Sequence, residues 1–302
     1  MIFIKQFFIP LFISFFFYKL IISKFATLIS DIPNNRSSHN FPKATSGGIV
    51  FAILSTILNV FNSNFLFLQC LPLAIFGLID DKFNLKAILR YLIQLIVCGT
   101  LVFYSDLGLP VIFQLLVIFA GSGIINFTNF MDGIDGLVAG CMLIILSSLY
   151  ILKVYELLPL IAGLLAFLFW NWSPSKIFMG DSGSTFLGGI FFGVLLKIHD
   201  PKTLIGVLLI STPLLGDAAF CVIKRFWAGK NIFKAHRSHL YQRLQRAGFS
   251  HTKVSIIYIL GTLTLAFSFI ILNLKYTIFI AILELFVIYY IDKNFAISFE
   301  NS

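Results

Sequence analysis

The sequence predicts an all-α, polytopic integral membrane protein, a bundle of about ten to eleven transmembrane helices. Of its 302 residues, 59% are hydrophobic and only 12% are charged, and the mean hydropathy of +0.96 lies far outside the range of soluble domains. Apolar runs of roughly 17 to 22 residues recur along nearly the whole chain, and this length crosses about 30 Å of hydrocarbon. Because no water-soluble core could bury so much apolar surface, we expect residues 1–302 to form one membrane-embedded domain.

The apolar runs set the expected spans in order along the chain. They lie near residues 3–22, 46–62, 64–79, 86–104, 110–126, 134–152, 157–171, 184–198, 203–221, 253–272 and 276–291. Several runs are short, so the sequence leaves the number of spans at ten or eleven. No small-residue cleavage site follows the first run, and a basic, polar segment comes next, so we expect this run to remain a membrane helix. The four cysteines fall within apolar runs without CxxC spacing, which favours packing over a metal or a disulfide.

The loops between these runs predict the orientation. Counted alternately, one set of loops with its flanks contains 17 of the 22 Lys and Arg residues, and the other set contains 5. The first set comprises 23–45, 80–85, 127–133, 172–183, 222–252 and the C-terminal tail. By the positive-inside rule this set is cytoplasmic, as expected of a protein in a bacterial inner membrane. Topology explains most of the net charge of +9, and without a separate basic domain we expect no nucleic-acid partner.

Five aspartates lie on the predicted cytoplasmic side, where packing does not require them. They are Asp80, Asp81, Asp132, Asp135 and Asp181. A carboxylate at the end of a membrane helix is costly if it faces lipid, so these groups are expected to face water, a metal or each other. The adjacent pair in GLIDDKFN can hold a hard cation or accept a proton from a phosphate. The alternative is a charged helix end, with a lysine as its neighbour.

The segment NFTNFMDGIDGL, residues 126–137, has the densest polar pattern. Asn126 and Asn129 are three residues apart, as are Asp132 and Asp135, so each pair shares one face if the segment is helical. Amide and carboxylate oxygens are the ligands expected for Mg²⁺ and for a ribose or base edge. The alternative is an ordinary Asn/Gly-rich turn between two spans.

The segment KIFMGDSGSTFLGG places Asp181 before Ser182 and Ser184, which can cap the helix that begins there. Free backbone N–H groups at that helix start favour an anion. A turn with a cap explains the Gly and Ser residues. It does not explain an Asp together with the apolar Phe178 at this edge of the membrane.

The longest polar loop, residues 222–252, contains FKAHRSHLYQRLQRAG. Donors such as His236, Arg237 and His239 suit a diphosphate, and the alternative is a basic amphipathic helix on anionic lipid headgroups. The two histidines have the i, i+3 spacing of a metal pair, but no thiolate or third imidazole accompanies them in the sequence, so zinc is not expected. The early loop PNNRSSHNFPKATSGG adds Arg36 and Lys43 on the same side, as a further contact or as a solvated connector.

Together these segments predict a metal and anionic-substrate site at one membrane surface, as in magnesium-dependent phosphoryl transfer. In order and spacing, GLIDDKFN, NFTNFMDGIDGL, FMGDSGSTFLG and HRSHLYQ resemble the motifs of the polyprenyl-phosphate N-acetylhexosamine-1-phosphate transferases, also called glycosyltransferase family 4. The resemblance covers about residues 31–250 and leaves 253–302 as C-terminal transmembrane helices. It implies an enzyme that uses Mg²⁺, or Mn²⁺ in its place, to move a sugar 1-phosphate from a UDP-N-acetylhexosamine to undecaprenyl phosphate, with release of UMP.

The resemblance also implies a role for each motif residue. The magnesium ligands would be Asp181 and Asn129. Asp80 would lie nearest the acceptor phosphate, as a base or only to orient it, with Asp81 as its support; these two and Asp181 are the expected catalytic residues. Phe178 would stack on the uracil. The other residues expected to bind nucleotide, diphosphate and sugar are Asn126, Asp132, Asp135, His236, Arg237 and His239.

Two departures from the family pattern bear on the substrate. The peptidoglycan branch has consecutive histidines in the last cytoplasmic loop and a Lys four residues after the first Asp of the pair, where this chain has HRSHLYQ and Asn84. The pattern favours an enzyme that initiates O-antigen-like or other surface glycans over the muramoyl-pentapeptide enzyme. The sugar stays open, and so does the oligomeric state, for which a homodimer is one option. From a different class, a secondary transporter also has membrane carboxylates, although usually near the midplane.

Overall fold

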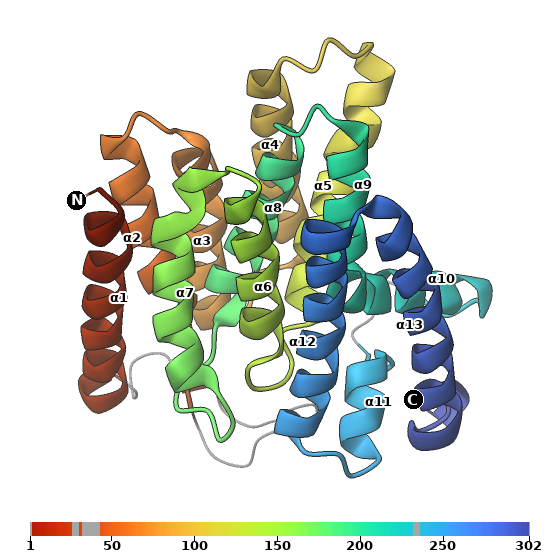
Figure 1. Cartoon of the computed structure of the whole chain (residues 1–302). Helices are drawn as coiled ribbons and strands as arrows, with labels where there is room; N and C mark the ends of the chain where they lie inside the picture. Colours follow the sequence, from red (N-terminus) through yellow and green to blue (C-terminus); the bar gives the residue numbers. More distant parts are fainter. Residues whose placement is uncertain (1, 26–29, 32–42, 232–235, 302) are drawn as a thin grey trace.

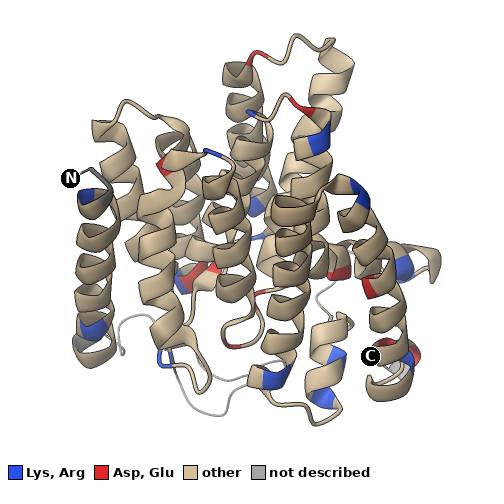
Figure 2. Ribbon diagram, in the orientation of Figure 1, with Lys and Arg blue, Asp and Glu red and all other residues tan. Residues whose placement is uncertain are grey.

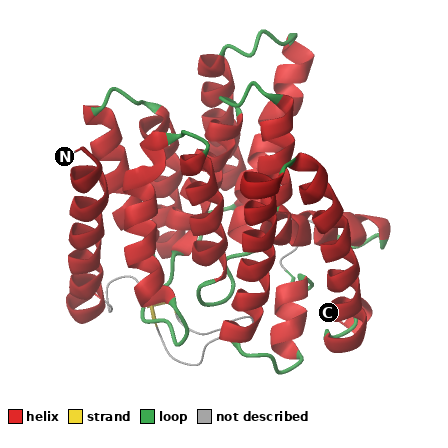
Figure 3. Ribbon diagram, in the orientation of Figure 1, coloured by secondary structure: helices red, strands yellow, loops and turns green. Residues whose placement is uncertain are grey.

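The computed structural model describes residues 2–25, 30–31, 43–231 and 236–301, and most of this part of the chain is helical (Figure 3). Most of the long helices run side by side in one bundle (Figure 1). In chain order the α-helices of the described residues are α1 (Ile2–Leu20), α2 (Gly48–Phe61), α3 (Leu66–Phe83), α4 (Ala87–Ser105), α5 (Val111–Phe130), α6 (Leu137–Ile151), α7 (Leu158–Asn171), α8 (Gly180–Leu195), α9 (Pro201–Ile210), α10 (Asp217–Trp227), α11 (Leu240–Arg246), α12 (His251–Phe267) and α13 (Leu274–Phe295).

Short segments interrupt or join these helices. Three are π-helical, namely η1 (Ile21–Phe25), η3 (Thr212–Gly216) and η4 (Ser268–Leu272), and two are 3₁₀ turns, η2 (Tyr155–Leu157) and η5 (Phe299–Asn301). The strands β1 (Ser30–Asp31) and β2 (Lys43–Ala44) form one antiparallel pair.

Each of the eleven predicted spans coincides with helix. Among the described residues, five helical segments are long and apolar enough to cross a membrane: Ile4–Ser23, Ala87–Ser105, Val111–Phe130, His251–Leu272 and Leu274–Phe295. The bent pair of α9 and the helical segment after it would make a sixth. The predicted fold class, an all-α polytopic membrane bundle, is confirmed, whereas the count of ten to eleven spans stays a prediction because helix length and composition alone do not decide it.

The predicted span over 203–221 is not one straight helix. α9 and the helical segment Thr212–Trp227 are bent by 62° relative to each other. Pro213 lies at the break, where it has no N–H to donate and its ring crowds the carbonyl of the preceding turn, which explains the local π segment η3. α10 therefore projects sideways from the bundle (Figure 1), with Lys224 and Arg225 in its last turn.

α8 is the central helix of the bundle, and all of its residues except the first two are buried. Two glycines of neighbouring helices make this packing close. A Cβ on Gly77 of α3 would lie 2.4 Å from the Ser182 nitrogen, and a Cβ on Gly48 of α2 would lie 2.1 Å from the Gly183 Cα. Only residues without a side chain allow backbones to approach so closely. The contact places the carboxyl end of α3 against the start of α8.

The described loops of the two alternate sets lie at opposite ends of the bundle (Figure 1). In the ribbon of Figure 2, most of the positions coloured for Lys and Arg lie in the lower half of the view, toward the predicted cytoplasmic loops. Arg36 of the early loop lies outside the described residues, whereas Lys43 belongs to β2.

Candidate active site

Asp81 connects the end of α3 to the start of α8. Its Oδ1 accepts a hydrogen bond of 2.8 Å from the Asp181 backbone N–H, and its Oδ2 accepts one of 2.6 Å from the Ser46 hydroxyl. Gly180 has a φ of +71°, and a Cβ there would lie 2.3 Å from Asp81 Oδ2, so only glycine fits this turn. A carboxylate at a helix N-terminus also interacts favourably with the helix dipole. Asp81 therefore holds the start of α8, and with it the Asp181 side chain, in place.

The expectation that the two serines cap α8 and leave its N–H groups free for an anion is wrong. The Ser182 hydroxyl donates to the Met179 carbonyl at 3.3 Å, and the Ser184 hydroxyl donates to the Gly180 carbonyl at 3.1 Å. The two serines are the third and fifth residues of α8, inside the helix, where a hydroxyl reaches back to a carbonyl rather than forward to an N–H. The anion at this helix start is the Asp81 carboxylate of the protein itself.

Asp80 is 6% exposed and lies beside a cationic side chain of α4. Its Oδ1 accepts a hydrogen bond of 2.6 Å from the Leu85 backbone N–H, and its Oδ2 lies 3.0 Å from Arg90 Nη1. The same Nη1 lies 3.4 Å from Asp181 Oδ2. One guanidinium group thus bridges carboxylates from α3 and α8, and these two carboxylates lie at one point of the structure.

Asn129 joins this group from the last turn of α5. Its Nδ2 donates to Asp181 Oδ1 at 2.8 Å and to the Ser184 hydroxyl at 2.9 Å. Asn126, one turn earlier, makes a reciprocal pair with Gln94 of α4, with Nδ2 to Oε1 at 2.6 Å and Nε2 to Oδ1 at 3.2 Å. Asn126 and Asn129 both lie in helix α5, so they share one helical face as predicted. Only Asn129 contacts a carboxylate of the site.

Arg90 and Gln94 contact the site but were not assigned to it from the sequence. In the sequence, Arg90 is one of the 17 Lys and Arg residues of the predicted cytoplasmic loops and their flanks. Both lie four residues apart within an otherwise apolar run, so they share one helical face. A polar pair inside a predicted span is itself a signal for a functional site, because each group is costly in lipid.

A cavity of about 700 Å³ opens next to these residues. Its polar end is lined by Asp80, Arg90, Asn126, Asn129, Asp181, His236, His239 and Gln242. The remaining wall is largely apolar and includes Leu73, Phe76, Ile88, Ile93, Phe119 and Phe127. A site with one charged end and one apolar wall suits a ligand that is amphipathic in the same way.

Asp132 and Asp135 do not converge on one helical face, because residues 131–136 form turns rather than helix. The Asp135 carboxylate points to other elements: it accepts hydrogen bonds from Ser175, at 2.7 Å from the hydroxyl and 3.2 Å from the N–H, and lies 3.4 Å from His251 Nδ1. Burial raises the pKa of Asp132 to about 7, and the carboxylates of Asp81 and Asp135 add to this shift. Neither residue is among those that line the cavity.

Phe178 also lies outside the cavity lining. Its backbone N–H donates to the Ala44 carbonyl at 2.8 Å, and its carbonyl accepts from the Gly47 N–H at 2.9 Å. The Lys43 ammonium lies 5.0 Å from the centre of its ring. The ring therefore belongs to the loop beside β2, and a ligand would have to extend beyond the cavity to stack on it.

His236 and His239 both line the cavity. Their rings stack at a centroid distance of 5.0 Å, and the ring of His239 stacks on Tyr241 at 5.8 Å. Burial lowers the pKa of His236 to about 4, with smaller contributions from His239 and nearby cations. Burial also lowers the pKa of His239. Both imidazoles are therefore neutral near pH 7. Arg237, between them in the chain, is not among the cavity-lining residues.

Two residues not assigned from the sequence anchor the histidines. Asp217 of α10 accepts hydrogen bonds from the backbone N–H groups of Leu240 at 2.9 Å and Tyr241 at 3.3 Å, so it caps α11. The Tyr241 hydroxyl donates to the Phe130 carbonyl at the end of α5, at 2.9 Å. Four of the seven residues of α11, among them Leu244, are buried, so one face of this helix packs against the bundle. The alternative of a basic helix on lipid headgroups stays a prediction.

Comparison with known proteins decides the family. The profile described as glycosyl transferase family 4 matches residues 63–199. A probable undecaprenyl-phosphate N-acetylglucosaminyl 1-phosphate transferase of Bacillus subtilis is 33% identical over 265 residues, which cover 76% of this chain and 74% of the relative. The chain belongs to glycosyl transferase family 4. The resemblance of its motifs is confirmed, and this family 4 protein is a multi-pass membrane glycosyl-1-phosphate transferase.

Two further relatives show the breadth of the family around this member. A phospho-N-acetylmuramoyl-pentapeptide-transferase of Lactobacillus gasseri is 30% identical over 257 residues, 71% of this chain and 79% of the relative. An undecaprenyl-phosphate alpha-N-acetylglucosaminyl 1-phosphate transferase of Thermotoga maritima is 29% identical over 241 residues, 76% of this chain and 78% of the relative.

Proposed function

We propose that this family 4 member transfers an N-acetylhexosamine 1-phosphate from a UDP-sugar to undecaprenyl phosphate and releases UMP. The reaction would take place at the cytoplasmic face of a bacterial inner membrane and start a cell-surface polysaccharide. The observation that supports it best is the cavity, which joins a carboxylate and amide cluster to an apolar wall. A polyprenyl phosphate has the same two parts, an anionic head and a hydrocarbon chain.

The residues at the polar end fit a magnesium ion. A cation already lies between the carboxylates, since the Arg90 guanidinium contacts both Asp80 and Asp181. The surrounding donors are carboxylate and amide oxygens, which a hard cation prefers. Asp181 and Asn129 would hold the ion, with Mn²⁺ able to replace it. When bound, it would neutralise charge on the diphosphate and polarise the phosphoryl group that is attacked.

The chain's own residues would then position the two substrates. Asp80 is buried and lines the polar end of the cavity, and in the proposal it lies nearest the acceptor phosphate. Arg90 is 44% exposed, so its guanidinium can turn from the carboxylates to the incoming phosphate and pair with it. Both carboxylate oxygens of Asp81 accept hydrogen bonds, one from the Asp181 N–H and one from the Ser46 hydroxyl. Asp81 would therefore hold Asp181 in position without touching substrate.

The histidines would bind the donor. Neutral imidazoles are hydrogen-bond donors without a full charge, so His236 and His239 can hold diphosphate oxygens that the cation also contacts. Asn126 lines the same cavity. Arg237, Asp132 and Phe178 lie outside it, and in the proposal they contact the sugar or the nucleotide where the donor extends into solvent. Asp135 would not contact the donor; it would hold the loop before α8 in place through its hydrogen bonds with Ser175.

The sugar is proposed to be an N-acetylhexosamine rather than the muramoyl-pentapeptide. Asn84 ends α3 with a φ of 50°, in the left-handed region, and its N–H donates to the Asp80 carbonyl at 2.8 Å. Asn tolerates this backbone better than the Lys of the peptidoglycan branch. A secondary transporter fits less well, since the carboxylates gather at one end of the bundle rather than along a path through it.

The test measures UMP release by the purified protein with Mg²⁺, undecaprenyl phosphate and a panel of UDP-N-acetylhexosamines and UDP-muramoyl-pentapeptide. We expect release with one N-acetylhexosamine donor, only in the presence of the lipid, and abolished by a chelator. Release without the lipid, or with the muramoyl donor alone, would contradict the proposal. If a folded preparation releases no UMP with any donor, transport becomes the leading alternative.

A further inference from the structure

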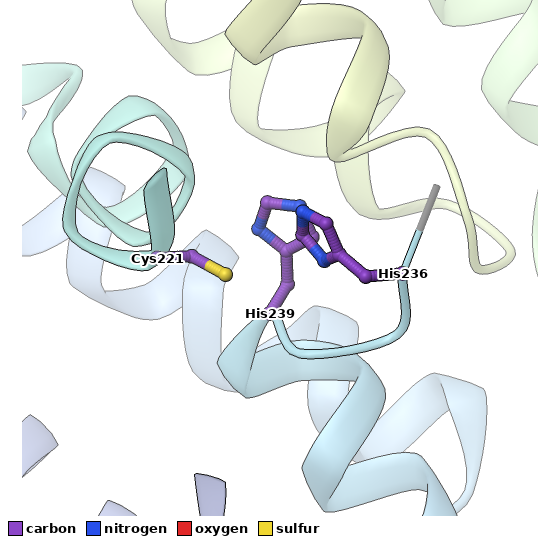
Figure 4. A group of neighbouring side chains, drawn as sticks. All are labelled: Cys221, His236 and His239. Carbon is purple, nitrogen blue, oxygen red and sulfur yellow. The ribbon is translucent and has the colours of Figure 1, made fainter. Parts of the chain in front are cut away.

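The sequence has no cysteine close to the histidine pair, but the tertiary structure brings a thiol next to it. Cys221 of α10 lies beside His236 and His239, and one ligand atom from each residue lies within 4.8 Å of the others. Figure 4 shows the thiol and the two imidazole rings gathered at one point between α10 and α11. We propose that these three side chains bind a divalent metal of borderline softness, such as Zn²⁺, at a site separate from the carboxylate cluster.

An unsatisfied polar atom points to a ligand here. His239 is 3% exposed, and its buried Nδ1 makes no hydrogen bond of regular geometry among the described residues. Leaving such an atom unsatisfied is costly, because it has lost its water and gained nothing in exchange. Coordination of a metal would satisfy it. Cys221 is 2% exposed and so would be held away from solvent oxidants.

The protonation states of the two imidazoles suit metal binding. The lowered pKa values of His236 and His239 leave both imidazoles neutral, with a lone pair available at pH 7. Metal binding would displace the proton of the Cys221 thiol into solvent and form a metal–sulfur bond. The resulting thiolate offsets part of the cation's charge, and Asp217, four residues earlier on α10, also faces His239. These two groups counter the nearby guanidinium groups.

The geometry selects the class of metal. In a tetrahedral zinc site, nitrogen and sulfur ligands at about 2.0–2.3 Å from the metal lie roughly 3.3–3.7 Å from one another. The present separations of up to 4.8 Å would close by a modest turn of the rings. His236 is only half buried and borders the cavity, so it can move, and the fourth position would open into the cavity. Mg²⁺ prefers oxygen ligands and is not expected at this site.

One consequence rests on the proposed function. The same imidazoles are assigned there to the donor diphosphate, so a metal held by them would exclude the UDP-sugar. Micromolar Zn²⁺ would then inhibit UMP release in competition with the UDP-sugar and not with undecaprenyl phosphate. This makes the cluster a candidate inhibitory site rather than part of catalysis.

The test uses purified full-length protein and Co²⁺ as the probe, with no activity readout. Co²⁺ bound to a thiolate absorbs in the near ultraviolet, and tetrahedral Co²⁺ gives intense visible bands. We expect both signals at one equivalent of Co²⁺ and their loss when Zn²⁺ is added. Cys221→Ser should remove the near-ultraviolet band, and His239→Asn should weaken binding by at least about tenfold.

Matched variants separate this site from others. Cys98→Ser changes another buried thiol, on α4, and Asp181→Asn changes the carboxylate cluster, and both should keep the Co²⁺ signal. Bands that persist in Cys221→Ser, or their absence from folded wild-type protein, would overturn the proposal. If Cys221→Ser does not fold, His236→Asn replaces it: this variant changes a partly exposed side chain and should weaken Co²⁺ binding, and visible bands of wild-type strength at one equivalent of Co²⁺ would sink the idea. Because none of these readouts needs turnover, they stand or fall independently of the proposed reaction.

Discussion

Two polar regions border the cavity, and they differ in chemistry and in how they are held. The acidic region consists of Asp80, Asp81, Asp181 and Asn129, on α3, α5 and α8. The histidine region consists of His236 and His239, before and at the start of α11. Hydrogen bonds to backbone N–H groups hold Asp80 and Asp81 rigidly at helix ends. The histidine region depends on the Asp217 cap, on the hydrogen bond from the Tyr241 hydroxyl to the Phe130 carbonyl, and on ring stacking.

The contrast shows what each region is suited to do. Like charges can be kept close only if the surrounding structure fixes them, and the glycine contacts of α8 supply that rigidity. Such a cluster suits a hard cation and the phosphoryl transfer that the cation would assist. Neutral imidazoles next to a thiol repel one another far less, so they need less support and suit either anion recognition or a softer metal. The following substitutions test whether the acidic region and the histidine region have these separate roles.

The largest effect is expected from the acidic region. Asp181→Asn keeps the side-chain size but removes a carboxylate proposed to hold the cation, so UMP release should fall by about 10²–10³-fold. Asp106→Asn, at an exposed turn with positive φ at the other end of the bundle, is the matched control. A folded Asp181→Asn protein with more than a tenth of wild-type turnover would contradict the assignment.

Arg90 should matter mainly for the lipid. Loss of a hydrogen bond between charged groups costs about 1.5–3 kcal/mol, so Arg90→Ala should lower kcat/KM for undecaprenyl phosphate by about 10–100-fold and leave the KM of the UDP-sugar nearly unchanged. Lys86→Ala, an exposed change at the start of the same helix, should have little effect. A loss confined to the UDP-sugar would place Arg90 with the donor instead.

Asp217 should affect stability more than chemistry. Asp217→Ala leaves the Leu240 and Tyr241 N–H groups without their acceptor, and loss of a helix cap costs about 0.5–2 kcal/mol. We expect a lower thermal midpoint and a smaller loss of turnover than in Asp181→Asn. An unchanged midpoint would show that α11 does not depend on this cap.

The smallest effect concerns pH. The folded pKa of His236, about 4, lies below the unfolded value of about 6.5. Between these values the unfolded chain binds a proton that the folded protein does not, so stability falls as pH is lowered from about 6.5 toward 4. In a chelator-containing buffer, His236→Gln should lose less of its thermal midpoint between pH 7.5 and 5 than wild type does. An equal decrease in both proteins would mean that His236 is not the group that titrates.

The sequence by itself determined the fold class, the positions of the apolar helices and the motif residues, because these depend on local composition. A run of about 20 apolar residues must form a helix in lipid whatever its neighbours are. It also placed Asp80, Asp181 and Asn129 on one side of the membrane, since loop alternation decides that. Pro213 can be read from the sequence, but the apolar composition of residues 203–221 does not show that the helix bends there.

Only the tertiary structure decided which of these residues face each other. Arg90 meets both carboxylates because α4 packs beside α3, and Asp135 turns to Ser175 because residues 131–136 leave the helical path. Cys221 joins the histidines only because α10 bends away from α9 and lies against α11. Such contacts link residues far apart in the chain, and helix packing, not local pattern, fixes the distances between them.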